Sequence, residues 1–328
     1  MPKAVALYSG GLDSVLAIKL LLDQGIRIEA LTCITPFFGS IPRNPPRILK
    51  GNPLVGFHCI DITETFLDVL RHPRYGFGRH LNPCIDCRIL MLRHAKAFME
   101  ETGADFVLTG EVLGQRPMSQ RRDTLRLIEV KSGLEGRLLR PLSARLLQPT
   151  EPEKEGLVDR ERLLDLQGRS RKTQMHLAES IDWQDYPTPG GGCLLTDAAF
   201  ADKVKPFLEE GFPDPEILKW VKIGRHFTLP GGGRLVVGRN KGENERIADM
   251  ARIDELLIYP MGIPGPTAIL LGNRSCEALR LAASITASYS DHPTVGEVAM
   301  AVSRGGVVCE HFTVSPIPRE QVKRYRAS

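Results

Sequence analysis

Apolar and polar positions alternate in blocks through the first half of the chain. Short apolar runs that suit buried strands are separated by longer stretches in which apolar residues recur every three or four positions, as on one face of a helix. These patterns predict strands at 4–8, 28–34 and 105–109, and helices at 15–24, 63–71, 88–101 and from about Asp159 onward. Such alternation is typical of a parallel sheet with helices on both faces. We therefore expect an α/β, doubly wound fold for this half.

The second half of the chain has shorter apolar runs and no regular alternation. It predicts a helix at 202–210 and strands at 235–237, 268–271 and 307–309. This pattern suits a smaller α+β domain. Between the halves, Pro187 to Gly192 is a proline- and glycine-rich stretch typical of a loop. We place a domain boundary near Ala198, which gives domains at 1–198 and 199–328.

At 328 residues, with 42% hydrophobic and 25% charged residues, the chain has the composition of a two-domain globular protein. No apolar run approaches the roughly 18 residues of a membrane span, and the N-terminus enters a predicted strand at once. We therefore expect a cytoplasmic protein that has no membrane segment. The chain contains seven cysteines, an odd number. In a reducing compartment, closely spaced cysteines indicate metal ligands or redox groups rather than disulfides.

The hexapeptide Ser9-Gly10-Gly11-Leu12-Asp13-Ser14 joins the first predicted strand to the first predicted helix. Two consecutive glycines allow positive φ angles that turn backbone N–H groups inward, and the N-terminus of the helix adds partial positive charge. The loop lacks the Gly-Lys-Ser/Thr ending of a Walker loop and carries an aspartate instead. It therefore predicts a site for pyrophosphate that differs from the Walker type.

Three cysteines form a second candidate site. Cys84 and Cys87 make a C-x-x-C pair at the start of a predicted helix, and Cys193 follows the glycine-rich loop. The helix N-terminus lowers thiol pKa values, which suits a metal, a cluster or disulfide exchange. A structural zinc would need a further ligand such as His94 or Cys59, whereas a redox pair would need no third cysteine. We favour a 4Fe-4S cluster, because three cysteines leave one iron open to bind exogenous sulfide.

The combined motifs resemble those of the PP-loop ATP pyrophosphatase superfamily, and in particular its 4Fe-4S-dependent tRNA thiouridine synthetases. The resemblance is carried by SGGLDS at 9–14, NPCIDC at 82–87, TGEVLGQRPMSQ at 109–120 and PGGGCLLTD at 189–197. TGEVLGQ is most similar to the matching segment of 4-thiouridine synthetases, but the spacing before Ser119 and Gln120 differs. The resemblance covers the first predicted domain and implies an adenine nucleotide alpha hydrolase-like fold.

The resemblance also implies which residues bind ATP and the cluster. The ATP-binding set is Ser9, Gly10, Gly11, Asp13, Ser14, Thr35, Arg88, Gly110, Gln115 and Gln120. In that set Arg88 would lie near the phosphates and Thr35 near the adenine. Asp13 is acidic in a site for anions, so we expect it to bind Mg²⁺, with capping of the loop as the alternative. Cys84, Cys87 and Cys193 would hold the cluster and act in catalysis.

The implied reaction replaces a uridine carbonyl oxygen by sulfur. ATP would adenylate the oxygen, pyrophosphate would depart, and sulfur bound at the cluster would displace AMP. We expect 4-thiouridine as the product, with 2-thiouridine at the wobble position as the alternative. Without a cluster, a persulfide on Cys84, Cys87 or Cys193 would carry the sulfur. Two other interpretations remain open: an amide-forming PP-loop ligase, and a non-catalytic RNA-binding protein that senses nucleotide or iron.

The second domain resembles the RNA-binding domain of the NFACT proteins, through GRHF at 224–227, VGRN at 237–240 and the following Glu243-Asn244. A lid or an oligomerisation domain is the alternative. The net charge of +4 is mild, so local clusters are the candidate contacts with tRNA phosphates. They comprise Arg121, Arg122, Arg137, Arg140, Arg145, Arg169, Arg171, Lys172, Arg225 and Arg239. The implied partners are tRNA and a sulfur donor, either sulfide or a cysteine desulfurase, and a homo-oligomer is compatible with the sequence. His72 and His80 are candidate proton relays.

Overall fold

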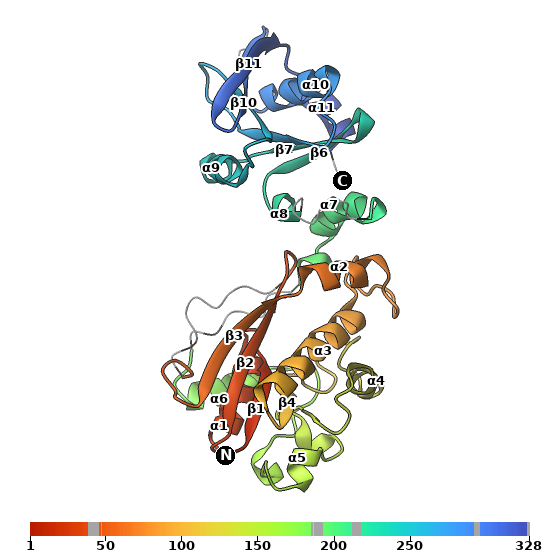
Figure 1. Ribbon diagram of the computed structural model, residues 1–328, viewed down its shortest axis with the longest axis vertical. Coiled ribbons are helices and arrows are strands. Elements are labelled where there is room, and N and C mark those ends of the chain that lie inside the picture. Colours follow the sequence, from red (N-terminus) through yellow and green to blue (C-terminus); the bar gives the residue numbers. More distant parts are fainter. Residues whose placement is uncertain are drawn as a thin grey trace. The chain divides into compact units, whose positions relative to one another are not determined.

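A computed structural model describes residues 1–38, 46, 48–184, 186, 193–211, 218–291 and 296–326. The chain forms two compact units, Met1–Ala198 and Ala199–Ser328 (Figure 1). The glycine-rich stretch at 187–192 and most of the 39–47 segment lie outside the described residues. Among the described helices, none combines the length and the apolar character that crossing a bilayer requires.

The first unit is built on a five-stranded sheet with the order β3-β2-β1-β4-β5. Its strands are β1 (Lys3–Leu7), β2 (Arg27–Ile34), β3 (Val55–Asp61), β4 (Phe106–Thr109) and β5 (Leu138–Leu139). All four neighbouring pairs are parallel. The carboxyl ends of β1, β2 and β4 therefore meet at one edge of the sheet, where ligands bind in folds of this kind.

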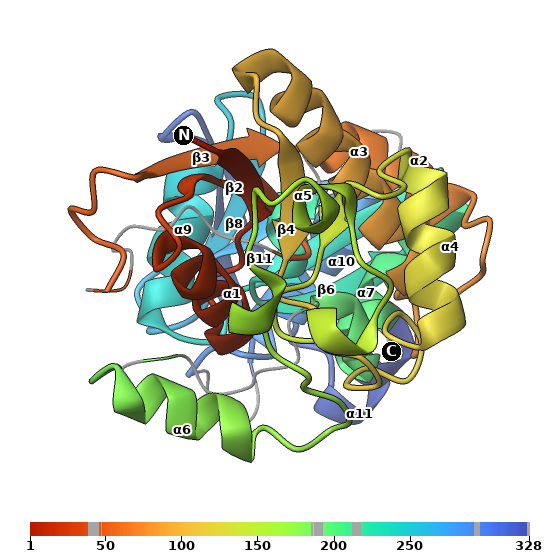
Figure 2. The ribbon, with the colours of Figure 1, turned by 90° about the horizontal axis from the view of Figure 1, so that it is seen from below.

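Helices cover both faces of this sheet, so the α/β, doubly wound prediction is confirmed. One face carries α1 (Leu12–Leu22) and α6 (Lys172–Ser180), and the other carries α3 (Cys84–Thr102) and α4 (Arg122–Ser132) (Figure 2). The side chains of β1 alternate between these two cores. Ala4 and Ala6 pack with α1, whereas Val5 and Leu7 pack with α3. The shorter helices α2 (Thr63–Arg71) and α5 (Glu151–Lys154) complete the unit.

The third helix begins earlier than the sequence pattern predicts. The Cys87 N–H donates to the Pro83 carbonyl at 2.8 Å, which draws the C-x-x-C pair into the first turn of α3. The helix ends at Gly103, whose φ of +64° closes the left-handed cap that glycine favours. Both cysteines therefore belong to the first turn of the helix.

Part of the sequence prediction is wrong between 110 and 180. The helix expected from Asp159 onward is only a 3-10 turn, Arg160–Arg162, and the true helix there is α6. Arg160 binds the Leu147 carbonyl at 2.9 Å and Arg162 binds the Asp23 carbonyl at 2.7 Å, so long-range contacts fix this segment. The pattern also failed to predict α4.

The second unit is the expected smaller α+β domain. Its antiparallel sheet has six strands in the order β11-β10-β8-β9-β7-β6. The strands are β6 (Arg225–Leu229), β7 (Gly233–Val237), β8 (Leu256–Pro260), β9 (Ala268–Leu271), β10 (Val298–Arg304) and β11 (Val307–Val314). One core contains residues of α10 (Cys276–Ala287), and a second contains residues of α8 (Leu218–Val221) and α9 (Lys241–Met250). The unit also contains α7 (Ala198–Glu209) and α11 (Arg319–Val322).

Candidate nucleotide and thiol site

The loop between β1 and α1 is held in shape by its own serines. Ser9 N–H and Oγ lie 3.4 and 3.2 Å from Ser14 Oγ, and Ser14 Oγ donates to the Gly11 carbonyl at 2.8 Å. Gly10 has a φ of +73°, the left-handed conformation that the double glycine predicts. The loop is thus preformed at the N-terminus of α1, where backbone N–H groups are suited to an anion.

Gly110 brings the end of β4 against this loop. A Cβ atom at position 110 would lie 2.5 Å from both Asp13 C and Ser14 N, a distance that real Cβ atoms do not tolerate. Only glycine therefore allows the two backbones to touch. The TGE segment and the SGGLDS loop form one continuous surface at the carboxyl edge of the sheet.

Asp13 is bound by two residues from distant parts of the chain. Its Oδ2 accepts a hydrogen bond from Gln115 Nε2 at 2.8 Å and an ion-paired hydrogen bond from Arg171 at 2.7 Å. Gln174 donates to Gln115 Oε1 at 3.1 Å and extends the network into α6. The structure thus brings the predicted residues Asp13 and Gln115 together, and adds Arg171 and Gln174 to them. Arg171 is half-buried at the loop, in contrast to the surface position expected for a tRNA contact.

Unsatisfied polar atoms are concentrated at this edge. Within the described part of the chain, the buried side-chain polar atoms that lack any hydrogen-bond partner are Asp13 Oδ1, Glu111 Oε1, Ser119 Oγ and Gln120 Oε1. Buried polar groups are nearly always paired in native proteins, and an exception requires a ligand, an ion or a water. All four atoms belong to the SGGLDS and TGEVLGQRPMSQ segments. This hydrogen-bonding deficit fits a bound polar ligand, and the free Asp13 Oδ1 fits a Mg²⁺ ion.

Thr35 follows β2, and its hydroxyl already has partners. Thr35 Oγ1 accepts hydrogen bonds from the N–H groups of Phe37 and Phe38, each at 3.1 Å. The side chain therefore shapes the turn after β2. The same turn receives the third cysteine segment, because the Leu194 N–H donates to the Phe37 carbonyl at 3.1 Å.

The three predicted cysteines occupy one neighbourhood. Burial raises the pKa of the Cys87 thiol; the Arg88 charge partly offsets this, and Cys193 and Cys84 raise it further. Burial likewise raises the pKa of Cys193 to about 11, with Cys84 adding to the rise and Arg116 opposing it. Cys84 and Cys193 are thus near enough to Cys87 to influence its ionisation, and burial keeps the thiols of Cys87 and Cys193 mainly protonated at neutral pH.

The described residues contain no group of three His, Cys, Asp or Glu side chains placed to hold one metal ion. A zinc site and a cluster held by three cysteines therefore both lack a preassembled ligand set among these residues. His94 lies 3.4 Å from Thr65 Oγ1 on α2, and Cys59 is exposed on β3. Thiolates are the usual ligands of a 4Fe-4S cluster, so Cys84, Cys87 and Cys193 fit that group by chemistry. The two candidate proton relays, His72 and His80, are exposed.

Arg88 directly follows the C-x-x-C pair and contacts the TGE segment. Its Nε lies 3.3 Å from Glu111 Oε1, and Glu111 also binds the buried Arg140 at 3.2 Å. Burial disfavours the Arg88 charge, but Glu111 and the nearby thiols more than compensate and raise its pKa. Arg140 was predicted as a phosphate contact; that prediction is wrong, because its guanidinium is enclosed among Glu111, Glu129 and the Leu125 carbonyl. Glu111 was not among the predicted site residues, although its motif was.

In the second unit, the two predicted arginines differ. Arg225 donates to the Gly238 carbonyl at 3.1 Å, and its guanidinium lies 4.6 Å from the centre of the Tyr289 ring. Arg239 instead pairs with Glu243, with Nε–Oε distances of 3.0 Å. The charge of Arg239 is therefore locally neutralised, whereas the described contacts of Arg225 include no acidic side chain.

Comparison with known proteins agrees with this division. Residues 1–145 match the family model "Thiamine biosynthesis protein (ThiI)", and residues 224–326 match "NFACT protein RNA binding domain". A probable tRNA sulfurtransferase of Thermotoga maritima is 36% identical over 122 residues, which make up 34% of this chain and 30% of that protein. The tRNA-specific 2-thiouridylase MnmA of Syntrophotalea carbinolica is 32% identical over 114 residues, or 31% of this chain and 32% of that protein.

Among solved structures, a 4-thiouridine synthetase–RNA complex with bound ATP is 26% identical, with a TM-score of 0.35 over 66% of this chain and 52% of that one. The alignments with the two curated relatives span about a third of each relative's length. The matches to family models follow the two folded units. Residues 1–145 are therefore similar to the ThiI family, and residues 224–326 are similar to the NFACT RNA-binding-domain family.

Proposed function

We propose that this protein is an ATP-dependent tRNA sulfurtransferase that exchanges a uridine carbonyl oxygen for sulfur. The observation that carries this proposal is that the four unsatisfied buried polar atoms all belong to the SGGLDS and TGEVLGQRPMSQ segments, while Arg88 interacts both with Glu111 of the second segment and with Cys84 and Cys87. A bound cation would satisfy Asp13 Oδ1, and a donor group of a ligand would satisfy Gln120 Oε1, because both atoms can only accept. The neighbouring thiols give the site a means to handle sulfur. The similarity of residues 1–145 to the ThiI family supports the same chemistry.

In the first step, the uridine carbonyl oxygen attacks the α-phosphorus of ATP. The bond between the α-phosphorus and the bridging oxygen breaks, and pyrophosphate leaves with the negative charge. Backbone N–H groups from Ser9 to Ser14 would bind the departing pyrophosphate, and Arg88 would stabilise charge that develops on the phosphates. Asp13 Oδ1 would bind Mg²⁺, which neutralises phosphate charge. Gln120 Oε1 is a free acceptor for a donor group of the nucleotide.

In the second step, sulfur adds to the activated carbon, the carbon–oxygen bond breaks, and AMP leaves. Cys84, Cys87 and Cys193 would hold a 4Fe-4S cluster, which supplies the sulfur nucleophile when bound. We propose sulfide or a cysteine desulfurase as the sulfur source and 4-thiouridine as the product. The similarity to a 2-thiouridylase favours 2-thiouridine as the second candidate. The second unit would bind the tRNA, consistent with its match to an RNA-binding family.

The test is anaerobic incubation of the iron-loaded protein with ATP, Mg²⁺, sulfide and unmodified tRNA. We expect pyrophosphate release that depends on tRNA, together with a thiolated uridine detected by nucleoside mass spectrometry. Standards of 4-thiouridine and 2-thiouridine distinguish the two products. Release of pyrophosphate with no thiolated nucleoside would indicate a different acceptor. The absence of both pyrophosphate and thiolated nucleoside would instead favour a non-catalytic RNA-binding protein.

A further inference from the structure

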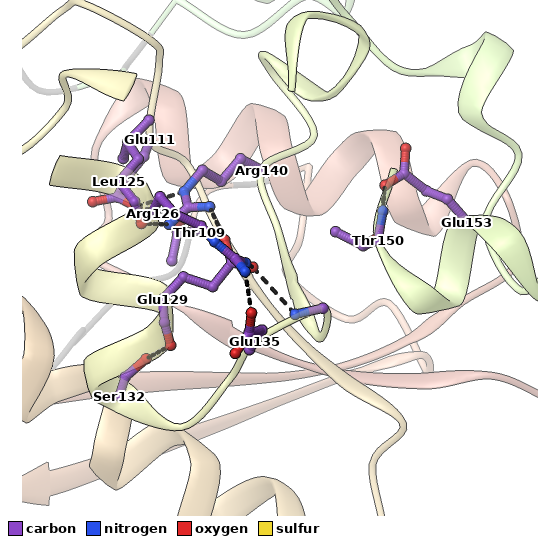
Figure 3. Close-up of polar contacts among 11 residues, drawn as sticks. Thr109, Glu111, Leu125, Arg126, Glu129, Ser132, Glu135, Arg140, Thr150 and Glu153 are labelled. Carbon is purple, nitrogen blue, oxygen red and sulfur yellow. Dashed lines mark hydrogen bonds and ion pairs between the residues drawn. The ribbon is translucent and has the colours of Figure 1, made fainter. Parts of the chain in front are cut away.

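A chain of alternating charges runs from the surface of α4 to the cysteine helix. It begins at the exposed Arg126, continues through Glu129 and Arg140, and ends with Glu111 and Arg88. Figure 3 shows the middle of this chain, where Arg140 lies between Glu111 and Glu129. This chain of charges links β5, α4, the end of β4 and the start of α3.

Arg140 is the centre of the chain and is almost fully buried, with 3% of its side chain exposed. Its three donor groups each have a partner. Nε binds Glu111 at 3.2 Å, one terminal nitrogen binds Glu129 at 2.9 Å, and the other binds the Leu125 carbonyl at 3.0 Å. A planar guanidinium can satisfy three such acceptors in one fixed orientation, which a lysine ammonium cannot reproduce. Arg140 is therefore an immobile group.

Glu129 fixes Arg140 from the other side. One carboxylate oxygen accepts from Arg140, and the other accepts from the Gly136 N–H at 3.2 Å and from Arg126 at 3.2 Å. Arg126 also pairs with Glu135 (Figure 3). Since every member has a partner, the network can stay charged in a buried setting.

The two oxygens of Glu111 have different environments. Oε2 accepts from Arg140 and from Thr109 Oγ1, both at 3.2 Å. Oε1 is buried without any hydrogen bond and faces only the ion pair with Arg88 at 3.3 Å. The Arg140 side of the carboxylate is thus locked, whereas the Arg88 side is held by charge alone. Arg88 is oriented, yet it is free to turn its N–H groups toward another anion.

We propose that Arg140 and Glu129 are positioning residues, which act through Glu111 to hold the Arg88 guanidinium at the nucleotide site. This inference rests on the proposed function for the identity of the anion, which is an ATP phosphate. It assigns a role to two residues that touch neither the nucleotide loop nor the cysteines. Glu111 Oε2, which Arg140 and Thr109 bind, fixes the carboxylate and so sets the position of Arg88. Glu111 Oε1 makes no hydrogen bond, which permits Arg88 to turn from Glu111 to an ATP phosphate.

The test compares ATP binding to Arg88→Gln, Arg140→Lys and the double variant by isothermal titration calorimetry. Arg140→Lys retains the buried positive charge but loses the planar guanidinium that binds three acceptors at once. We therefore expect ATP binding to weaken by about tenfold, a loss typical of a residue that supports a binding group. In the Arg88→Gln background, Arg140→Lys should cause no further loss, because its effect passes through Arg88. Independent losses that multiply would overturn the proposal, as would unchanged affinity in the folded Arg140→Lys variant.

A second measurement separates this inference from the proposed function. If the unaltered protein does not bind ATP, the proposed function fails. Urea unfolding of Arg88→Gln, Glu129→Gln and their double variant then tests whether Glu129 and Arg88 are coupled. We expect the combined effect on the unfolding equilibrium constant to depart from the product of the single effects by at least about threefold. A combined effect equal to the product of the two single effects would overturn the proposed coupling. The same cycle serves if Arg140→Lys does not fold.

Arg93→Gln is the matched control. Arg93 also lies on α3 and binds a carbonyl of α4, that of Lys131, with N–O distances of 3.2 and 3.1 Å. It is exposed and outside the charge chain. Its substitution should leave ATP affinity within about twofold, as for a surface position. A loss equal to that of Arg140→Lys would point to general loosening of α3, and would overturn a specific role for Arg140.

Discussion

Arg171 and Asp13 are 158 positions apart in the chain, yet the Arg171 guanidinium donates to Asp13 Oδ2 at 2.7 Å. The pair joins the start of α6 to the SGGLDS loop. It leaves Asp13 Oδ1 buried and without a partner, so one oxygen of the carboxylate is neutralised while the other can accept a ligand. The SGGLDS loop thus has a cation, the Arg171 guanidinium, beside it.

This pair predicts a loss of ATP chemistry when either charge is removed. We expect Asp13→Asn to lower pyrophosphate release by about 100-fold, the scale of removing one electrostatic group from a reaction site. Arg171→Gln should lower it by about tenfold or more, because the loop loses its fixed cation. The assay is pyrophosphate release in the presence of tRNA. Arg162→Gln, which alters an exposed arginine bound only to the Asp23 carbonyl in the described contacts, is the control. Full activity of Arg171→Gln would contradict the role of the pair.

Gly110 and Gly11 predict contrasting effects of added methyl groups. Gly110→Ala forces a Cβ to within 2.5 Å of the loop backbone, so we expect about 1–3 kcal/mol lower stability and loss of ATP binding. Gly11→Ala meets only Ser9 Oγ at 3.4 Å, so stability should change by less than about 0.5 kcal/mol. Its ATP binding should still weaken if the loop holds phosphates. Urea unfolding and calorimetry separate the two effects, and equal stability of both variants would refute the close approach.

The cysteine set predicts which substitutions remove iron. After anaerobic loading with iron and sulfide, Cys84→Ala, Cys87→Ala and Cys193→Ala should each lose most of the bound iron and its visible absorption, because each removes a cluster ligand. Cys276→Ala alters an exposed thiol of the second unit and should keep the iron. Metal analysis of the purified proteins provides the measurement. Iron retained by all three variants would exclude these ligands, and zinc in its place would favour a structural metal.

His226 predicts acid sensitivity of the second unit. Burial, followed by the charge of Lys203, lowers its pKa from 6.5 to about 4. The unfolded state therefore binds the proton more tightly, and folding stability is full above about pH 6.5 and declines as pH falls toward 4. The difference corresponds to at most about 3 kcal/mol.

Urea unfolding at pH 7 and pH 4.5, followed by Trp220 fluorescence in a Trp183→Phe background, measures this decline. His226→Gln should reduce the pH dependence, because it removes the titrating group. It should also lower stability at pH 7, because the imidazole makes a 2.9 Å hydrogen bond to the Ile223 carbonyl that the substitution disrupts. An unchanged pH profile in His226→Gln would assign the effect to another group.

The two arginines of the second unit predict different contributions to tRNA binding. Arg225→Gln should weaken binding and reduce the slope of log affinity against log salt by about 1, as for the loss of one phosphate contact. Arg239→Gln should have a smaller effect, because the charge of Arg239 is paired with Glu243. Filter binding across a salt series tests both variants. A larger slope change for Arg239→Gln would reverse this assignment.

The fold class and the strand, loop and helix that carry the candidate site could be predicted from local signals. Glycine at 10 and 11 and the apolar run before it are short-range features, and they define a strand, a loop and a helix wherever they occur. The periodic apolar stripe of α3 likewise depends only on its own residues. Strong local signals of this kind predicted β1, α1, α2 and α3, with boundaries shifted by a few positions.

Pairings between charged residues could not be predicted in this way. Arg140 and Arg171 both occur in basic clusters that suggested phosphate contacts, yet one is buried between two glutamates and the other is bound to the phosphate loop. Strand order decides such pairings, because parallel strands bring residues that are far apart in sequence to one edge of the sheet. The sequence by itself determined the phosphate loop, the C-x-x-C helix and the two-domain division as expectations. Only the tertiary structure decided which charge neutralises which, since that depends on distances between segments that no local pattern records.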